Sequence, residues 1–350
     1  MDIKSSFCEG RRVSHVTGIM DLPWVITTRS LNFPCVLLLD SQSNPSLLEL
    51  KEEYDYYVRH CHRPIQLTPK FHFPPGRVFL VGSCNGFICL LNGSTYIEKH
   101  FVYISNPLLG EYFEVKLPEW EISFCHVAYG FCFSKVSRDY KVLRLVVRKV
   151  NKVSELEVYT LGVGEKWRNV GEILCPVWYN FGEVNINGAL HWMDNEKYDS
   201  IYSFDIEKEK VKSLPAPPGL EAPCSSLRLA ELGNYLCLTD YMNRFSANIN
   251  IWSMKEYGIA ESWTKDSILV DSIPRGMVNY HFEPIFIYKD GEILIQSLTK
   301  LASDNSEMKT FRVVNVYGNV NVVTRYIPSF YSLKTIMGGK LSSHKCLSED

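Results

Sequence analysis

The chain has 350 residues, of which 46% are hydrophobic and 22% are charged. This balance is close to the globular average, so we expect a packed core and exclude an intrinsically disordered chain. The formal net charge of -2 lacks the basic excess of a dedicated nucleic-acid-binding protein. No stretch approaches the roughly 18 apolar residues of a membrane helix. We therefore expect no nucleic acid and no membrane among the partners.

The cysteines indicate a reducing environment. There are 11 of them, an odd number, and no two form a C-x-x-C pair. Most lie among apolar neighbours, as Cys89 and Cys237 do, where a free cysteine behaves as a small hydrophobic residue. We therefore predict reduced core thiols in a cytoplasmic or nuclear protein, and the first residues lack the apolar stretch of a signal peptide. His60 and His62 are too few ligands for a zinc site, so no metal and no cofactor is predicted.

Strand-sized apolar runs recur along the chain, and helical periodicity is almost absent. Four times, two such runs are joined by glycine beside Asn or Asp, and the turns are Asn85-Gly86, Asn187-Gly188, Gly233-Asn234 and Asp290-Gly291. These dipeptides supply the positive φ angles of two-residue β-hairpins. A fifth, degenerate turn lies at 137–139, so the turns recur about every 50 residues, a period typical of propellers.

A second strand pair follows each hairpin, and four strands in about 50 residues make one propeller blade. Residues 35–70 hold a further strand set, and the run from Phe311 to Tyr326 completes the last unit. We therefore predict an all-β fold, a β-propeller-like array of about six four-stranded blades. The predicted regions are an irregular N-terminal segment (1–34), the propeller (35–335) and a C-terminal tail (336–350). A large sandwich or a pair of barrels is the alternative, although sandwiches do not repeat at a fixed spacing.

Long connections between successive blades would lie together on one face of such a disc, and here they are rich in aromatic residues. Binding residues concentrate in long loops on rigid scaffolds, and exposed Trp, Tyr and Arg are the usual anchors of interfaces. We therefore predict that a substrate is bound by Trp120, Trp178, Tyr179, Phe181, Arg275 and Tyr280. The alternative is that these aromatic residues fold back and cap neighbouring blades.

No set of side chains in the sequence indicates a reactive centre, so we predict no catalytic residues. Cys84 lies in a G-x-C-x-G stretch, but a nucleophile elbow leads into a helix, and a strand-like run follows here. His126 and His191 lie in strand-like runs and are expected to be hydrogen-bonded structural residues. Two charged stretches, Glu207 to Lys210 and the basic residues between Arg138 and Lys152, are expected to be a solvated turn and a solvated face.

A series of short strings, each weak alone, is specific in combination. The strings are Val81 to Leu90, Ser105 to Pro107, Leu117-Pro118, Ala128 to Phe131, Asp139 to Val142, Leu156 to Leu161, Trp167-Arg168, Asn187 to Trp192, Ser203 to Asp205, Ile251 to Gly258 and Ser262-Trp263. In order and spacing, this series resembles the F-box-associated domain of plant F-box proteins, including the F-box/kelch-like ones. The resemblance implies a propeller-like domain that recruits a target protein for ubiquitination by an SCF-type E3 ubiquitin ligase.

Proteins of that family normally begin with a helical F-box. Residues 1–34 are too short for one and carry no amphipathic helices, so docking to the ligase's linker subunit is not predicted from the sequence. A truncated F-box-like protein without a ligase role is therefore one alternative. The other is a propeller hydrolase or glycan-processing enzyme, which requires carboxylates or a histidine–metal cluster at the mouth of the central channel. Because the acidic residues fall mostly in turns, we predict a protein-interaction module and no enzyme.

Overall fold

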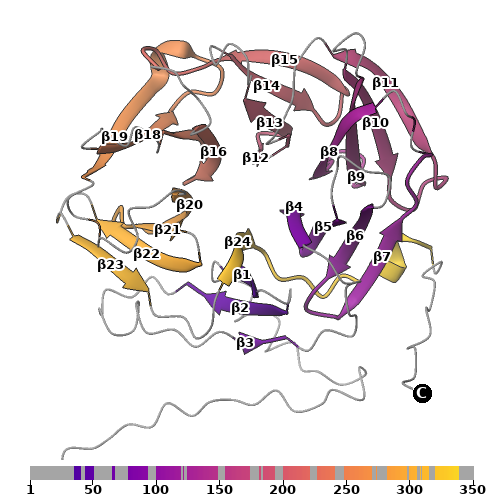
Figure 1. Cartoon of the computed structure of the whole chain (residues 1–350), viewed down its shortest axis with the longest axis horizontal. Helices are drawn as coiled ribbons and strands as arrows, with labels where there is room; N and C mark the ends of the chain where they lie inside the picture. Colours follow the sequence, from indigo (N-terminus) through magenta and orange to yellow (C-terminus); the bar gives the residue numbers. More distant parts are fainter. Residues whose placement is uncertain are drawn as a thin grey trace, which may run out of the picture.

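The computed structural model of the chain describes residues 35–40, 44–50, 65–67, 78–93, 100–119, 121, 124–148, 154–173, 181–182, 184–193, 200–220, 227–240, 248–269, 273, 282–297, 299–305, 308, 310–314 and 320–338. Within this part of the chain, the strands form six four-stranded antiparallel sheets around a central axis (Figure 1). The predicted all-β, six-bladed propeller is therefore confirmed, and the sandwich alternative is wrong. None of the helices in the described ranges is both long and apolar enough to cross a bilayer.

Five blades are built from consecutive strands, with the first strand of each nearest the central axis. Blade II contains β4 (Val78–Cys84), β5 (Phe87–Gly93), β6 (His100–Asn106) and β7 (Glu111–Val115). Blade III contains β8 (Phe124–Phe133), β9 (Tyr140–Arg148), β10 (Ser154–Thr160) and β11 (Trp167–Ile173). Blade IV contains β12 (Val184–Ile186), β13 (Ala189–Met193), β14 (Ser200–Asp205) and β15 (Lys210–Pro215). Blade V contains β16 (Leu227–Leu232), β17 (Tyr235–Asp240), β18 (Asn248–Met254), the short 3-10 helix η1 (Ala260–Ser262) and β19 (Trp263–Leu269). Blade VI contains β20 (Phe282–Ile287), β21 (Ile293–Ser297), β22 (Lys300–Asn305) and β23 (Thr310–Val314).

Blade I closes the ring by joining strands from the two ends of the propeller. Its inner strand is β24 (Val320–Tyr326), which pairs with β1 (Cys35–Asp40), and β2 (Pro45–Glu49) and β3 (Ile65–Gln66) follow outward. The prediction that the run from Phe311 to Tyr326 completes the last unit is therefore wrong, because that run is divided between blades VI and I. This pairing closes the ring, because strands from the two ends of the propeller share one sheet, and β24 remains the edge strand on the inner side of that sheet.

A buried side chain strengthens this closure. Gln296, on β21 of blade VI, donates from Nε2 to the carbonyl oxygen of Asn321 at 3.1 Å. Its Oε1 accepts a hydrogen bond from the backbone N–H of Val323 at 3.0 Å. The amide thus pairs with two backbone groups of β24 and ties the last blade to the closing strand.

Three of the four predicted turns are two-residue hairpins with positive φ at both positions, whereas Asp290-Gly291 lies in a longer loop and has positive φ only at Gly291. Both residues of the turn between β4 and β5 have positive φ, 46° at Asn85 and 86° at Gly86. The turn between β12 and β13 repeats this pattern at Asn187 and Gly188. Paired positive φ angles match the twist of the two flanking strands and favour a tight hairpin.

The core lies mainly between neighbouring blades. Phe87 of blade II and Tyr140 of blade III, for example, make an edge-to-face contact with ring centroids 4.9 Å apart. The cysteines whose side chains are described are free thiols, all buried or half-buried, and they are Cys35, Cys84, Cys89, Cys132 and Cys237. The apolar residues of this sequence thus pack the blades against each other, as in a ring that depends on blade-to-blade contacts.

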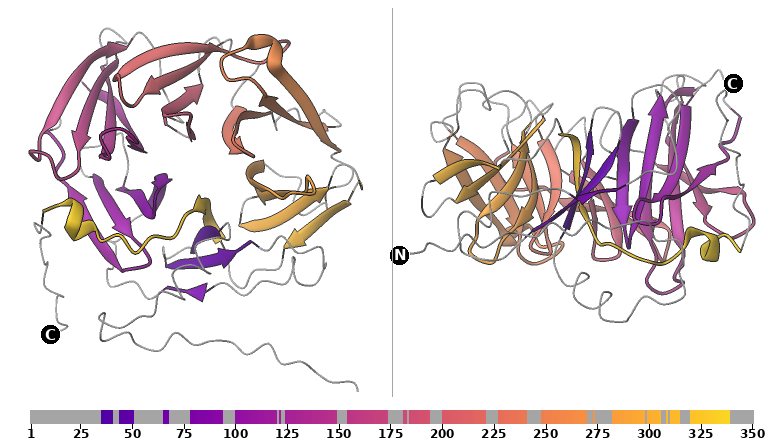
Figure 2. Two further views of the ribbon diagram at one scale, coloured as in Figure 1. Left: turned by 180° about the vertical axis from the view of Figure 1, so that it is seen from behind. Right: turned by 90° about the horizontal axis from the view of Figure 1, so that it is seen from below.

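The chain continues past β24 as a segment that we call the C-terminal strap, residues 327–338. The strap runs from blade I across blade II to blade III (Figure 2). It ends in the short helix α3 (Leu333–Ile336), which lies against β7. Leu333 is 0% exposed and Met337 is 2% exposed, and both belong to the core between blades II and III.

Candidate functional site

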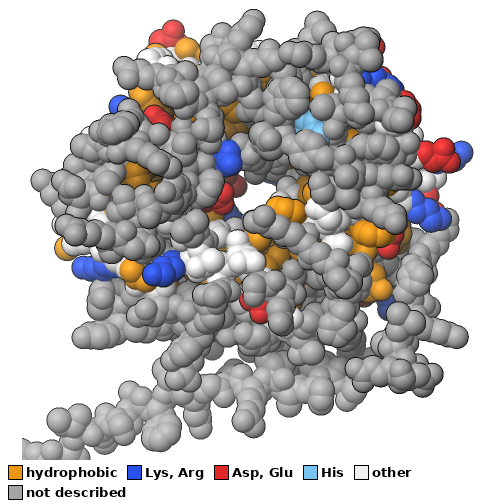
Figure 3. All heavy atoms as spheres, in the orientation of Figure 1, with side chains coloured by type: hydrophobic (Ala, Val, Ile, Leu, Met, Phe, Trp, Pro, Cys, Tyr) orange, Lys and Arg blue, Asp and Glu red, His pale blue; other side chains and the backbone are white. Residues whose placement is uncertain are grey.

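The strand order defines two faces of the disc. The turn face carries the hairpin turns between the first and second and between the third and fourth strands of each blade, and the strap lies on it. On the opposite face, which we call the loop face, the connections from one blade to the next begin and end. The loop face points toward the viewer in Figure 3, where most surface atoms belong to residues outside the described ranges.

Most of the predicted substrate-binding residues lie outside the described residues; they are Trp120, Trp178, Tyr179, Arg275 and Tyr280. Phe181 is described, and it is only 5% exposed. Its ring centroid lies 4.8 Å from that of Trp192, within the core between blades III and IV. Phe181 therefore packs between blades, as the capping alternative expects, while the other five residues stay predictions.

A central channel is enclosed by the inner strands of all six blades, with a volume of about 1480 Å³. Figure 3 shows it as an opening at the centre of the disc, with basic and acidic side chains at its rim. Arg228, Glu231, Glu283 and Arg325 are among the residues that line it. An ion pair between Arg325 of β24 and Glu231 of β16 joins two inner strands that are not neighbours.

Two acidic side chains of the channel wall are held by contacts with other blades, and one histidine is buried. Glu231 is bound by Arg325, and Glu207 accepts hydrogen bonds from Ser134 Oγ at 2.7 Å and from the Val136 N–H at 3.0 Å. Burial lowers the pKa of His126 to about 4, so the imidazole is neutral at pH 7. Within the described ranges, no three His, Cys, Asp or Glu side chains are placed to hold a metal ion. Glu231 and Glu207 therefore take part in contacts that join different blades.

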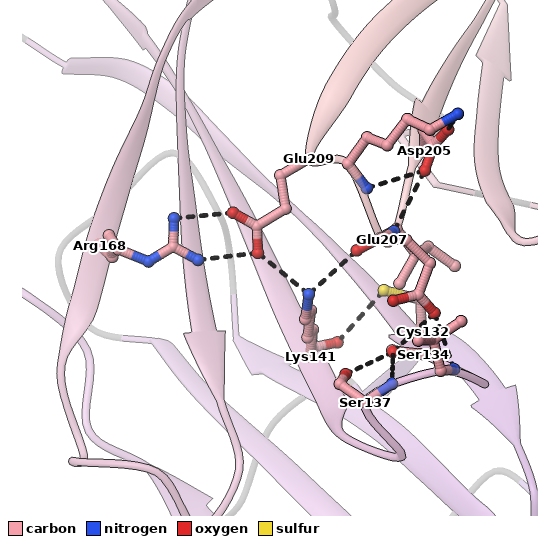
Figure 4. A network of polar contacts seen from close by, with 11 residues as sticks. Cys132, Ser134, Ser137, Lys141, Arg168, Asp205, Glu207 and Glu209 are labelled. Atoms are coloured by element: carbon pink, nitrogen blue, oxygen red, sulfur yellow. Dashed lines mark hydrogen bonds and ion pairs between the residues drawn. The ribbon is translucent and has the colours of Figure 1, made fainter.

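A polar network fixes blade IV to blade III (Figure 4). Lys141 of β9 is only 7% exposed, and its Nζ donates to the Ile206 carbonyl oxygen and to Glu209 Oε1, both at 3.0 Å. Glu209 also accepts two bonds from Arg168 of β11, at 2.8 and 2.7 Å, and the Arg168 hydrogen bond is the main reason that its pKa is lowered. The turn from Glu207 to Lys210 was expected to be solvated, and Glu207, Lys208 and Lys210 are indeed exposed. The prediction missed that the carboxylates of Glu207 and Glu209 also bind the neighbouring blade.

Lys141, Arg144 and Arg148 of the basic stretch are paired, in contrast to the prediction of a solvated face. Arg138 is exposed as predicted, and Lys149 and Lys152 lie outside the described residues. Arg144 Nη1 lies 2.8 Å from Glu157 Oε2, and Arg148 Nε lies 2.6 Å from Glu155 Oε1. The alternation of β9 turns these side chains toward the acidic residues of β10, so the local charge is neutralised.

Two candidate reactive residues are structural. Cys84 ends β4 and is followed by a turn and β5, so no nucleophile elbow forms, and burial holds its pKa well above the ordinary value. His191 is buried, with Nε2 2.6 Å from the hydroxyl of Tyr257 and Nδ1 3.2 Å from the Val184 carbonyl oxygen. The prediction of a hydrogen-bonded structural His191 is confirmed.

Comparison with curated proteins finds plant relatives. F-box protein At3g07870 of Arabidopsis thaliana is 29% identical over 289 residues, which cover 74% of this chain and 66% of that protein. F-box/kelch-repeat protein At3g23880 of the same plant is 27% identical over 236 residues, which cover 65% of this chain and 60% of that protein. The chain therefore spans less than two thirds of the length of either relative.

Comparison with solved structures finds matches of low identity and low TM-score. TolB from Acinetobacter baumannii superposes with a TM-score of 0.47 at 10% identity, over 85% of this chain and 67% of that one. An exo-beta-1,3-galactanase from Phanerochaete chrysosporium gives a TM-score of 0.40 at 10% identity, over 70% of this chain and 68% of that one. The family of F-box associated beta propeller domains matches residues 41–325, a span that includes strands of all six blades. Because that match covers most of the chain, this protein belongs to the family of F-box associated beta propeller domains.

Proposed function

We propose that this propeller is the substrate-recruiting module of an F-box protein in an SCF-type E3 ubiquitin ligase, acting in the cytoplasm or nucleus. The observation that carries the proposal is the family match over 41–325, together with relatives that are named as F-box proteins. Since those relatives are longer than this chain, docking to the ligase's linker subunit is assigned to an F-box and not to the propeller.

We further propose that the target protein binds at the loop face. Trp, Tyr and Arg are the residues that most often dominate binding energy, and the blade connections of this face are rich in them. The turn face over blades II and III is already covered by the strap, whose Leu333 and Met337 are buried there. The loops of this face are connected to a closed ring of six sheets, and binding residues concentrate in loops on such scaffolds.

The test joins an F-box to the N-terminus of the full chain and measures which proteins become ubiquitinated in plant cells. The changes Trp178→Ala, Tyr179→Ala and Tyr280→Ala are combined in one variant. Loss of an interface anchor typically weakens binding by about 2 kcal/mol or more, so target ubiquitination should fall at least about tenfold. Tyr235→Ala with Ile259→Ala is the control, because both side chains are exposed and lie by turns of the opposite face.

Two results would overturn the proposal at different levels. If the F-box fusion assembles with the ligase but raises ubiquitination of no protein, the recruiting role is wrong. If targets are ubiquitinated equally by the fusion and by its triple variant, recruitment stands and the loop face is wrong. A thermal unfolding curve of each variant shows that the propeller is folded in both comparisons.

A further inference from the structure

The strap is held like a bound peptide and not like a strand. Within the described residues, none of positions 327–338 pairs with a strand, and the matched family span ends before them, at 325. Ile327, Phe330 and Tyr331 are among its exposed side chains, while Ser329, Ser332 and Leu333 contact the blades. The strap therefore lies outside the strands of the propeller and contacts them through backbone groups and a few buried side chains.

Two side chains of blade II recognise the backbone of the strap. Asn106 is fully buried, and its Nδ2 donates to the carbonyl oxygens of Ser329 at 2.9 Å and Tyr331 at 3.0 Å. The Oδ1 of the same residue accepts from the Leu108 and Leu109 N–H groups of its own turn, at 3.1 and 3.3 Å. Because that turn orients the amide, the donor is in place before the strap arrives, which lowers the entropy lost on binding.

The carboxylate of Glu111 binds the next part of the strap, at Ser332 and Leu333. It accepts hydrogen bonds from Ser332 Oγ at 2.9 and 3.0 Å, and its Oε2 accepts from the Leu333 N–H at 2.7 Å. Directly after this point, Leu333 and Met337 enter the core between blades II and III. Their spacing of four residues puts them on one side of the helical turn. Polar and apolar contacts thus specify both the path and the side chains of the segment.

Two glycines leave room for the strap. A Cβ on Gly86 would collide with Ser329, and a Cβ on Gly162 would collide with the carbonyl oxygen of Ile336. Gly164, in the same turn as Gly162, has a similar φ, 73° against 75°, but no atom lies within 4 Å of the position of its Cβ. Gly188, which corresponds to Gly86 in blade IV, is equally open. Of these four turn glycines, the two under the strap are therefore the ones that another segment approaches closely.

We propose that Gly86, Asn106, Glu111 and Gly162 mark a peptide-recognition site, the strap site, and that residues 327–338 occupy it as a separable ligand. The ligand class is an extended segment that ends in one helical turn, with the pattern Ser-x-x-Ser-Leu-x-x-x-Met of Ser329 to Met337. The site lies on the face opposite to the proposed target surface, so it is independent of the proposed function.

The test uses the full chain with Leu333→Ser and Met337→Ser, which removes the apolar anchors and releases the strap but leaves the site intact. A fluorescent peptide with the natural sequence of residues 327–338 is then titrated in. We expect it to bind this released variant at least about tenfold more tightly than the wild-type chain, whose site is filled. Adding Gly162→Ala should abolish binding, and adding Gly164→Ala should leave it unchanged, because both changes place alanine at a similar φ.

Failure of the peptide to bind a released variant that unfolds cooperatively would overturn the proposal. Equal binding with Gly162→Ala and Gly164→Ala would also overturn it, because the peptide would then bind elsewhere. If the released variant does not fold, the proposal is tested by hydrogen exchange on Gly162→Ala and Gly164→Ala, each made in the chain with its natural Leu333 and Met337. The Leu333 and Met337 amides should exchange at least about tenfold faster in Gly162→Ala than in Gly164→Ala, whereas equal rates in the two variants would show that the strap is part of the core.

Discussion

Replacing Glu209 tests whether blade IV is held to blade III by charge. Glu209 lies in the turn between β14 and β15, and its carboxylate is shared by Lys141 of β9 and Arg168 of β11. In Glu209→Ala, the buried ammonium of Lys141 keeps only its bond to the Ile206 carbonyl oxygen. A buried charge that loses its counter-ion destabilises the folded state, because it no longer has compensation for the water that it gave up.

The structure sets the size of the effect. Removing one partner of a buried ion pair costs about 3–5 kcal/mol, and an exposed pair contributes about 0–1 kcal/mol. Lys141 is buried but keeps one hydrogen bond, and the Arg168 side chain is 56% exposed. We therefore expect Glu209→Ala to lower the free energy of unfolding by about 2–3 kcal/mol. Lys208→Ala, in the same turn, should change it by less than about 0.5 kcal/mol, because the Lys208 side chain is 68% exposed.

Urea unfolding followed by tryptophan fluorescence measures both variants. The double variant Lys141→Met with Glu209→Met removes both charges and should recover much of the loss, since an apolar pair needs no compensation. The pKa of Glu209 is lower in the folded than in the unfolded chain, so its stabilisation is present above the unfolded pKa and is lost as pH falls through the folded pKa. If Glu209→Ala is as stable as Lys208→Ala, or if the double variant is as unstable as Glu209→Ala, the reasoning is refuted.

Two further predictions concern buried polar side chains. Burial lowers the pKa of His191 to about 4, so the unfolded chain binds this proton first and acid destabilises the fold. Between pH 7 and 4.5, urea titrations should show that wild type loses about 2–3 kcal/mol more than His191→Gln, whereas parallel pH profiles would contradict this. Gln296→Leu removes the partners of two backbone groups of β24 and should cost about 2 kcal/mol in the same assay. Lys300→Leu, at an exposed position, is the control for Gln296→Leu. Equal stability of these two variants would argue against a role of Gln296 in holding β24.

Local chemistry made the blades predictable. Asn85-Gly86 and Asn187-Gly188 can be recognised as hairpin turns because few other dipeptides adopt positive φ at both positions. Repetition of this turn then predicts both the strand content and the number of blades. The ring closure was missed, because the pairing of Cys35 with Tyr326 joins strands that are distant in sequence and leaves no local signal.

The charged contacts between blades could not be predicted from the sequence either. Glu207 and Glu209 stand among lysines and have the composition of a solvated turn, while their partners Ser134, Lys141 and Arg168 come from the preceding blade. The strap left a weaker clue, since Leu333 and Met337 are spaced as neighbours on a helical turn. Only the fold shows that a buried surface of two blades receives them.

The C-terminal part of the chain connects most of the ring. Arg325 of β24 reaches Glu231 of blade V, Gln296 of blade VI holds β24, and β24 itself pairs with β1 of blade I. The strap then binds blade II through Asn106 and enters the core of blade III. Residues 320–338 therefore contact five of the six blades.

This arrangement links the C-terminal segment to the proposed recruiting surface without any direct contact. Loops bind well only when their scaffold holds them in the bound arrangement, because otherwise the entropy of ordering them opposes association. The blade connections start and end on the ring that β24 closes and that the strap braces across blades I to III. Loosening β24 should therefore weaken target binding at the loop face by disordering the positions of the loops. Release of the strap, which leaves β24 paired with β1, should affect that binding much less.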